Sequence, residues 1–223
     1  MTDYKTRRKI MVDTQIRPSD VTKFPIIDAF LSVPREKFVP DGKREAAYIG
    51  ENFQIGPSRI ILEPRTLAKL LDALDIHNDE LVLDVGSGLG YSSAVISLIA
   101  QVVIAVEDDS SLASEAAEIL SEIGMDNVVV QVAKLEDGAP EHGPYDVIIL
   151  QGGVEEIPTS ILKQLKNGGR IGAIFIEKGL GTAKIGFKLN NKITWRYSFN
   201  AAAPILQGFF KPVSYTHLRA HET

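Results

Sequence analysis

The segment of this sequence best suited to chemistry is a glycine-rich turn that follows a short apolar run. Residues 82–91 read Val-Leu-Asp-Val-Gly-Ser-Gly-Leu-Gly-Tyr. Glycines allow the backbone to turn tightly and to approach a ligand closely, and ligands of α/β proteins lie at the carboxyl ends of strands. On its own, such a turn is also typical of a plain strand-to-helix connection, so a ligand site needs a second signal.

An acidic residue at the end of the next apolar run provides that signal. Glu107 directly follows Val102–Val106, roughly 20 residues beyond the first glycine, where a carboxylate can accept hydrogen bonds from ribose hydroxyls. Asp84 at the end of the preceding strand would repel a pyrophosphate, but it suits the cationic amino group of S-adenosylmethionine. The charges therefore favour S-adenosylmethionine over NAD. The expected cofactor residues are Asp84, Gly86, Ser87, Gly88, Gly90 and Glu107.

The elements around these residues predict a parallel sheet covered by helices on both faces. Continuous apolar runs alternate with amphipathic stretches, which is typical of a doubly wound, Rossmann-like α/β fold. The expected strands are Leu81–Val85, Val102–Val106, Val128–Val132, Val147–Leu150 and Arg170–Ile176. The expected helices are Glu63–Ile76, Tyr91–Ala100, Ser110–Ile123 and a short one near Thr159–Leu165.

The two ends of the chain depart from this alternation. Past Gly181, Lys184–Leu189 and Ile193–Phe199 flank Asn190-Asn191-Lys192, so we expect an antiparallel hairpin at the sheet edge. At the other end, residues 2–40 predict a helical cap, with Pro25 placed where a helix can begin.

Three segments follow from these patterns. Residues 1–62 are expected to form the helical N-terminal cap with a substrate-side loop, and residues 63–212 the S-adenosylmethionine-binding α/β domain. Residues 213–223 have neither periodicity nor a partner element, so we expect a non-native tail.

Composition narrows the class of partner. A net charge of −5 argues against nucleic acid or an anionic membrane as the main partner. The longest nearly apolar run, Val95–Val106, is far shorter than the roughly 20 residues that cross a bilayer. The chain has no cysteine, which is compatible with a reducing compartment, and we expect the cytoplasm. His77 and His142 are expected to have no catalytic role, and no spacing of metal ligands is present.

Several further stretches together resemble the protein-L-isoaspartate O-methyltransferase family over roughly residues 5–178. They are Ser-Val-Pro-Arg-Glu-Lys-Phe-Val-Pro at 32–40, Ala47-Tyr48, Ile55-Gly56, Pro-Tyr-Asp-Val-Ile-Ile at 144–149, Ile157-Pro158 and Gln-Leu-Lys-Asn-Gly-Gly-Arg at 164–170. The resemblance implies the fold, S-adenosylmethionine as cofactor, and methyl esterification of isoaspartyl carboxylates in damaged proteins or peptides. The resemblance also implies that spontaneous succinimide formation follows the esterification, in the repair of aged proteins.

The sequence departs from the family where the acceptor should be held. The family's Gly-Gln-Thr-Ile-Ser-Gln-Pro reads Ser-Arg-Ile-Ile-Leu-Glu-Pro at 58–64, so the active-site serine falls on Leu62 and the threonine on Ile60. Losing a hydrogen bond to a charged group costs about 1.5–3 kcal/mol. Ile60 and Leu62 also fit a buried, strand-like stretch that packs the cap.

The catalytic residues therefore stay unassigned, with Ser58, Arg59 and Glu63 as nearby candidates. The added carboxylate of Glu63 would repel an incoming carboxylate, whereas Arg59 would compensate for it or bind the acceptor.

A second departure lies after the third apolar run, where the family's Gly-Asp-Gly reads Ala133-Lys134-Leu135. The acidic residue expected near the adenine amino group is a lysine, so we expect weaker or altered cofactor affinity, with Lys134 and Leu135 at this position. Two alternatives stay open: a methyltransferase for a more apolar, small-molecule acceptor, and a non-catalytic S-adenosylmethionine-binding domain. The sequence gives no oligomeric state.

Overall fold

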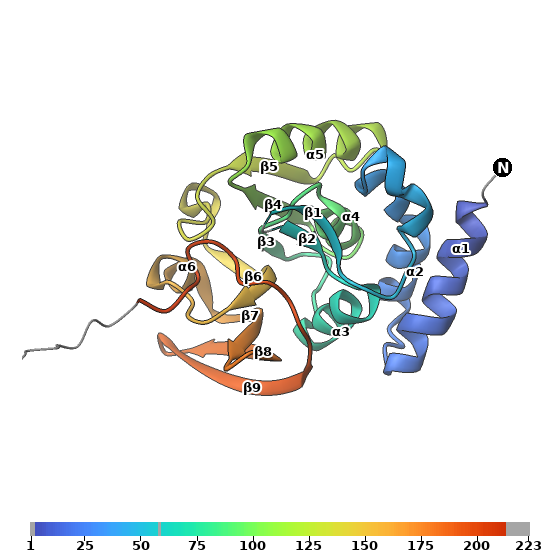
Figure 1. Cartoon of the computed structure of the whole chain (residues 1–223). Helices are drawn as coiled ribbons and strands as arrows, with labels where there is room; N and C mark the ends of the chain where they lie inside the picture. The colour runs from blue at the N-terminus through green and yellow to red at the C-terminus, as the bar shows by residue number, and fades with distance from the viewer. Residues whose placement is uncertain (1–2, 58, 213–223) are drawn as a thin grey trace, which may run out of the picture.

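The computed structural model describes residues 3–57 and 59–212, within which a seven-stranded mixed sheet carries helices on both faces (Figure 1). The strand order is β5-β4-β3-β6-β7-β8-β9. The strands are β3 (Leu81–Val85), β4 (Val102–Glu107), β5 (Val128–Val132), β6 (Tyr145–Val154), β7 (Leu165–Glu177), β8 (Leu180–Leu189) and β9 (Lys192–Asn200). The predicted tail, 213–223, and Ser58 lie outside the described residues.

The direction of winding reverses at β3. β3 pairs in parallel with β4 on one side and with β6 on the other. After β4 the chain adds β5 on the same side of β3. It then crosses to the other side of β3, where it forms β6 and β7. Ligands of open α/β sheets bind at such a switch point, beyond the carboxyl ends of the strands. The doubly wound fold predicted from the sequence is confirmed, and it brings the glycine-rich turn to this point.

Alternate residues of β3 pack into two different cores. Val82 belongs to the core formed with the cap and with α3 (Pro64–Leu74), α4 (Tyr91–Ser97) and α5 (Ser110–Glu122). Leu83 and Val85 belong to the opposite core, which includes Ile161 of α6 (Thr159–Gln164) and Leu206 from the segment after β9. A strand buried on both faces explains why these runs are apolar without alternation.

The C-terminal edge is antiparallel, as predicted. β8 pairs with both β7 and β9. The turn between β8 and β9 holds two residues, Asn190 and Asn191, with φ of 50° and 60°, and Lys192 already pairs with Leu189. The prediction of a three-residue turn was therefore one residue too long. Asparagine tolerates positive φ, which the favoured two-residue hairpin turn requires at both positions.

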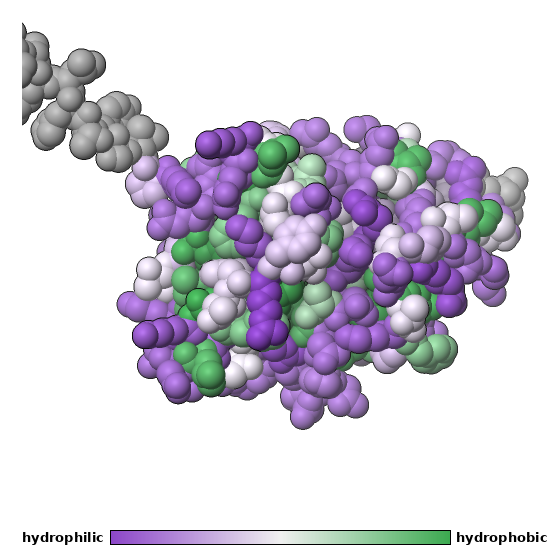
Figure 2. Space-filling view, turned by 90° about the horizontal axis from the view of Figure 1, so that it is seen from below, coloured by the Kyte–Doolittle hydropathy of each residue, from purple (hydrophilic) through white to green (hydrophobic). Residues whose placement is uncertain are grey.

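The N-terminal cap is mostly helical. It comprises α1 (Tyr4–Met11), a π-helical turn (Val12–Ile16), a 3-10 turn (Arg17–Ser19) and α2 (Phe24–Ser32), then the 3-10 turns Arg35–Phe38 and Asp41–Ala46. Proline stands in the first turn of α2, as expected from the sequence. Within residues 3–57 and 59–212, no helix combines the length and the apolar character needed to cross a membrane. On the face shown in Figure 2, polar residues surround smaller apolar patches.

A small antiparallel hairpin follows the cap. Its strands are β1 (Phe53–Gly56) and β2 (Arg59–Ile61), and Gln54 pairs with Ile60. The sequence did not predict the hairpin, because strands of four and three residues are too short for a periodic signal.

Candidate cofactor and acceptor site

The glycine-rich turn is held against β4 by its own backbone. The amides of Gly86 and Ser87 donate to the carbonyl of Val106, at 2.8 and 3.2 Å. Gly86, Gly88 and Gly90 have φ of 77°, 56° and 89°. These values lie in the left-handed region, which glycine enters at no steric cost. The turn therefore needs glycine at all three positions, and Gly90 leads directly into α4.

Asp84 lies in β3, two residues before the turn, and is fully buried. One carboxylate oxygen accepts from the hydroxyls of Ser92 and Ser93, both at 2.6 Å, and the other from Nε2 of Gln151 at 2.6 Å. Burial raises the pKa of Asp84, and these three hydrogen bonds oppose the shift. The carboxylate thus ties β3 to α4 and β6. Its contact with a cofactor amino group stays a prediction.

Glu107 ends β4 and faces the same turn from the side. Its Oε2 accepts from the amide of Gly88 at 2.8 Å. Its Oε1 accepts from the amides of Asp108 and Asp109, at 3.0 and 3.1 Å. The side chain is fully buried. Burial raises the pKa of Glu107, and the guanidinium of Arg59 opposes the shift.

Arg59 brings the hairpin into this site. Its Nε lies 3.0 and 3.1 Å from the two carboxylate oxygens of Glu107, and Nη2 is paired with Asp108. The side chain is 5% exposed. The sequence named Arg59 as an acceptor-side candidate and Glu107 as a cofactor residue, but it did not predict their pairing. Residues 48 positions apart give no local signal of contact.

The positions of the family's serine and threonine are buried. Leu62 is 1% exposed and Ile60 is 9% exposed, so the interpretation of a buried, strand-like stretch is confirmed. The carbonyl of Leu62 accepts from Nη2 of the buried Arg35 at 3.0 Å. Glu63 stands before α3 and accepts from the hydroxyl of Thr66 at 2.6 Å. Leu62 and Glu63, the two residues before Pro64, are thus both held by hydrogen bonds within the protein.

After β5, the two residues at the adenine-side position differ in exposure. Lys134 is exposed and Leu135 is fully buried. A methyl of Leu135 lies 3.7 Å from the point where a Cβ on Gly86 would stand. Leu135 therefore forms part of the wall beside the turn.

Three residues that were not predicted as site residues complete the surroundings of the turn. Leu206 lies 3.2 Å from the Cβ position of Gly86, and Ile55 lies 2.5 Å from that of Gly88. Gln151 holds Asp84. A polar residue directly after the apolar run Val147–Leu150 was a usable signal for Gln151, whereas nothing local marks the other two.

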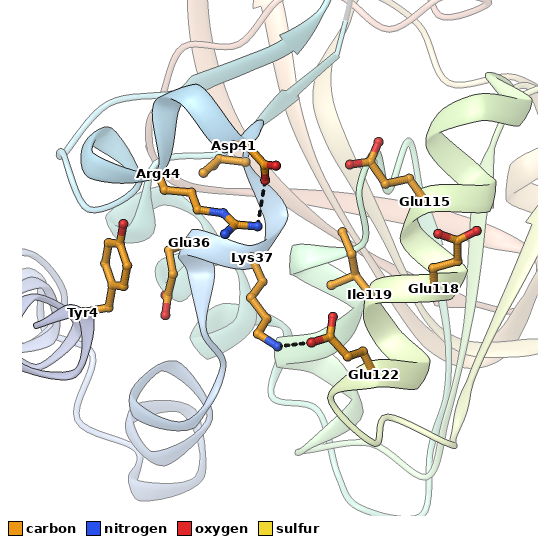
Figure 3. Close-up of a pocket in the computed structure, with 10 residues that line it drawn as sticks. Tyr4, Glu36, Lys37, Asp41, Arg44, Glu115, Glu118, Ile119 and Glu122 are labelled. Carbon is orange, nitrogen blue, oxygen red and sulfur yellow. Dashed lines mark hydrogen bonds and ion pairs between the residues drawn. The ribbon is translucent and has the colours of Figure 1, made fainter. Parts of the chain in front are cut away.

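A surface hollow with a volume of about 460 Å³ lies elsewhere, between the cap and α5 (Figure 3). Lys37 bonds Glu122 at 2.6 Å and Arg44 bonds Asp41 at 2.7 Å across or beside it. Its lining includes none of the expected cofactor residues. His77 and His142 are exposed and lie outside this lining too. The glycine-rich turn remains the candidate site.

Comparison with known proteins identifies the family. The family model described as protein-L-isoaspartate(D-aspartate) O-methyltransferase matches residues 6–187. This chain belongs to that family. The family resemblance inferred from the sequence is thereby confirmed, and with it the expectations of a methyltransferase enzyme and of its cofactor class.

Individual relatives agree with the family match. A protein-L-isoaspartate O-methyltransferase of Syntrophus aciditrophicus is 36% identical over 171 residues, covering 77% of this chain and 78% of the relative. One of Dictyoglomus turgidum is 35% identical over 166 residues, covering 74% and 75%. Both alignments span most of the relative, so the similarity is not confined to the cofactor half.

Solved structures of isoaspartyl methyltransferases share the fold. One superposes with a TM-score of 0.79 at 24% identity, over 92% of this chain and 66% of that chain. A Plasmodium falciparum protein, solved in complex with S-adenosyl-L-homocysteine, superposes with a TM-score of 0.77 at 18% identity, over 93% and 99%. Together with the strand order, these confirm the methyltransferase fold.

Proposed function

We propose that this chain is an S-adenosylmethionine-dependent protein-L-isoaspartate O-methyltransferase that esterifies isoaspartyl carboxylates in damaged proteins or peptides. The observation that carries the proposal is the placement of Glu107 against a turn of three positive-φ glycines at the switch point of the sheet. The family match over residues 6–187 supports the same assignment.

The residues present fit the cofactor. A carboxylate at the end of β4 suits ribose hydroxyls, and a turn without Cβ atoms allows close approach of a ligand. We assign Glu107 to the ribose, Gly86, Ser87, Gly88 and Gly90 to the turn that cradles the cofactor, Lys134 and Leu135 to the adenine side, and Asp84 to the cationic amino group. When bound, the cofactor supplies an electrophilic methyl group on a sulfonium.

The protein's own contribution is positioning. A carboxylic acid has a pKa of about 4 in water, so the acceptor is already anionic at pH 7 and needs no general base. The side chains must align it with the sulfonium and keep water out. The apolar Ile60 and Leu62 serve the second task and offer no donor for the first. Isoaspartyl transfer is therefore expected to be slower than a hydroxyl-bearing acceptor loop would allow.

Three further expectations remain proposals. The boundary between the cap and the α/β domain is placed at 62/63, the partner is a damaged protein or peptide rather than nucleic acid or a membrane, and the compartment is the cytoplasm. The net charge of −5 supports the choice of partner.

Transfer of radiolabelled methyl from S-adenosylmethionine to an isoaspartyl peptide is expected, at a rate well above that for the matching aspartyl peptide. The labelled product should be an ester that base hydrolyses. Cofactor binding measured by calorimetry on the same sample, without transfer to either peptide, would contradict the proposed acceptor and would favour a different, more apolar one.

A further inference from the structure

The hydrogen-bonding capacity of Glu107 is fully used in this structure. An ionised carboxylate offers about four lone-pair sites. The amides of Gly88, Asp108 and Asp109 take three of them, at 2.8–3.1 Å. The Nε of Arg59 lies within 3.1 Å of both oxygens. Ribose hydroxyls can therefore reach this carboxylate only when Arg59 moves away.

The glycine-rich turn is covered as well. Ile55, from the same hairpin as Arg59, lies over Gly88, and Leu206 lies over Gly86. Leu206 belongs to the segment 201–209, which we call the strap. In Figure 1 the strap runs back from β9 past β6 toward α6. Gly86 and Gly88 are both buried, so the surface that a cofactor would touch is occupied by protein side chains.

One side chain joins the hairpin region to the strap. Asn52 donates from Nδ2 to the carbonyl of Ala202 at 2.7 Å, and its Oδ1 accepts from the amide of Glu63 at 2.9 Å. Asn52 lies directly before β1 and Glu63 directly before α3. The two covers of the turn are thus linked to each other and to the start of the acceptor-side helix.

We propose that Arg59 is an internal latch on the cofactor site, which competes with the ribose of S-adenosylmethionine for Glu107. The inference rests on the proposed function and adds a means of regulation to the same site. Cofactor binding exchanges the ion pair for ribose hydrogen bonds and displaces the β1–β2 hairpin. Asp108 is 28% exposed and already pairs with Arg59, so the released guanidinium keeps a partner at the rim.

The latch lowers the apparent affinity for cofactor, because only the released state binds it. Replacing Arg59 by glutamine is expected to tighten the Kd for S-adenosylmethionine by roughly tenfold, within the usual range of coupling between two states. Calorimetry on the full chain measures this change. Arg65→Gln is the matched control: Arg65 lies six residues away, is 46% exposed and pairs with Glu63, and its loss should leave the Kd unchanged.

Glu107→Gln distinguishes the role of Glu107 as the partner of Arg59 from its role in binding the cofactor. In the Arg59→Gln background it should weaken binding more than it does in the wild type, because in the wild type it also removes the partner of the latch. A merely structural role for Arg59 would give the same loss in both backgrounds. Unchanged or weaker cofactor binding in Arg59→Gln would overturn the latch. If Glu107→Gln still weakened binding in that case, the assignment of Glu107 to the cofactor would hold without the latch.

Asn52→Ala provides a second route that leaves Glu107 and Arg59 in place. It removes the tie between the hairpin and the strap. It should also tighten cofactor binding, and an unchanged Kd would count against the latch even if Arg59→Gln failed to fold. Absence of binding in every variant, the wild type included, would instead refute the proposed function.

Discussion

Gly181→Ala should lower the free energy of unfolding by about 3 kcal/mol, the upper end of the usual cost of overpacking. A Cβ at this position would collide with the carbonyl oxygen of Ala201, and it would lie 3.2 Å from a methyl of Ile176. The obstacle is backbone, so no rotamer change relieves it. Ala201 begins the strap, and its amide donates to the carbonyl of Gly181 at 3.1 Å. The added methyl would therefore displace the strap and break this hydrogen bond.

Urea unfolding followed by circular dichroism measures this loss, and Gly42→Ala is the control. Gly42 lies exposed in a 3-10 turn, and its Cβ would meet nothing within 4 Å. That substitution should leave stability unchanged or raise it by up to about 1 kcal/mol, since alanine restricts the unfolded chain. Equal stability of the Gly181 variant and the wild type would show that the strap is not seated on this residue.

The glycine-rich turn and the strands on either side of it could be predicted from the sequence because their signals are local. Positive φ at Gly86, Gly88 and Gly90 demands glycine, and the strand before them is buried on both faces and so is apolar throughout. The position of Glu107 was predictable because one helix and one strand separate it from the turn. All of these features lie within about 25 residues of one another in the sequence.

The cover of the site could not be predicted, because its contacts join distant segments. Arg59 meets Glu107 across 48 residues, and Asn52 meets Ala202 across 150. An arginine near an acceptor loop is as consistent with binding a substrate carboxylate as with neutralising a buried glutamate. Only the fold decides which carboxylate it reaches, and here it reaches Glu107.

Arg35 illustrates a motif whose residue types were recognisable but whose role was not. The side chain is fully buried, and its Nε donates to the carbonyl of Ala47 at 2.8 Å while Nη2 donates to that of Leu62. The guanidinium carbon lies 4.6 Å from the ring centroid of Tyr91. The stretch at 32–40 therefore contributes to positioning, because Arg35 anchors Leu62, in the segment 58–64, to the cap.

Leu62→Ser should lower the free energy of unfolding and raise the rate of methyl transfer. Leu62 is 1% exposed, and truncating a buried leucine to a small residue costs about 2–5 kcal/mol, mainly through the cavity that it leaves. Urea unfolding measures this loss. Leu62→Met, which conserves volume and adds no donor, should cost less than about 1.5 kcal/mol and is the control.

The same substitution places a hydroxyl where the sequence resemblance puts the family's serine. A hydrogen bond to a charged group contributes about 1.5–3 kcal/mol, so the rate of methyl transfer to an isoaspartyl peptide, per folded molecule, should rise by roughly one to two powers of ten. Leu62→Met should leave that rate unchanged. A Leu62→Ser variant that folds but transfers no faster would mean that the acceptor carboxylate is held by other donors, and that Leu62 closes the site without ever facing the substrate.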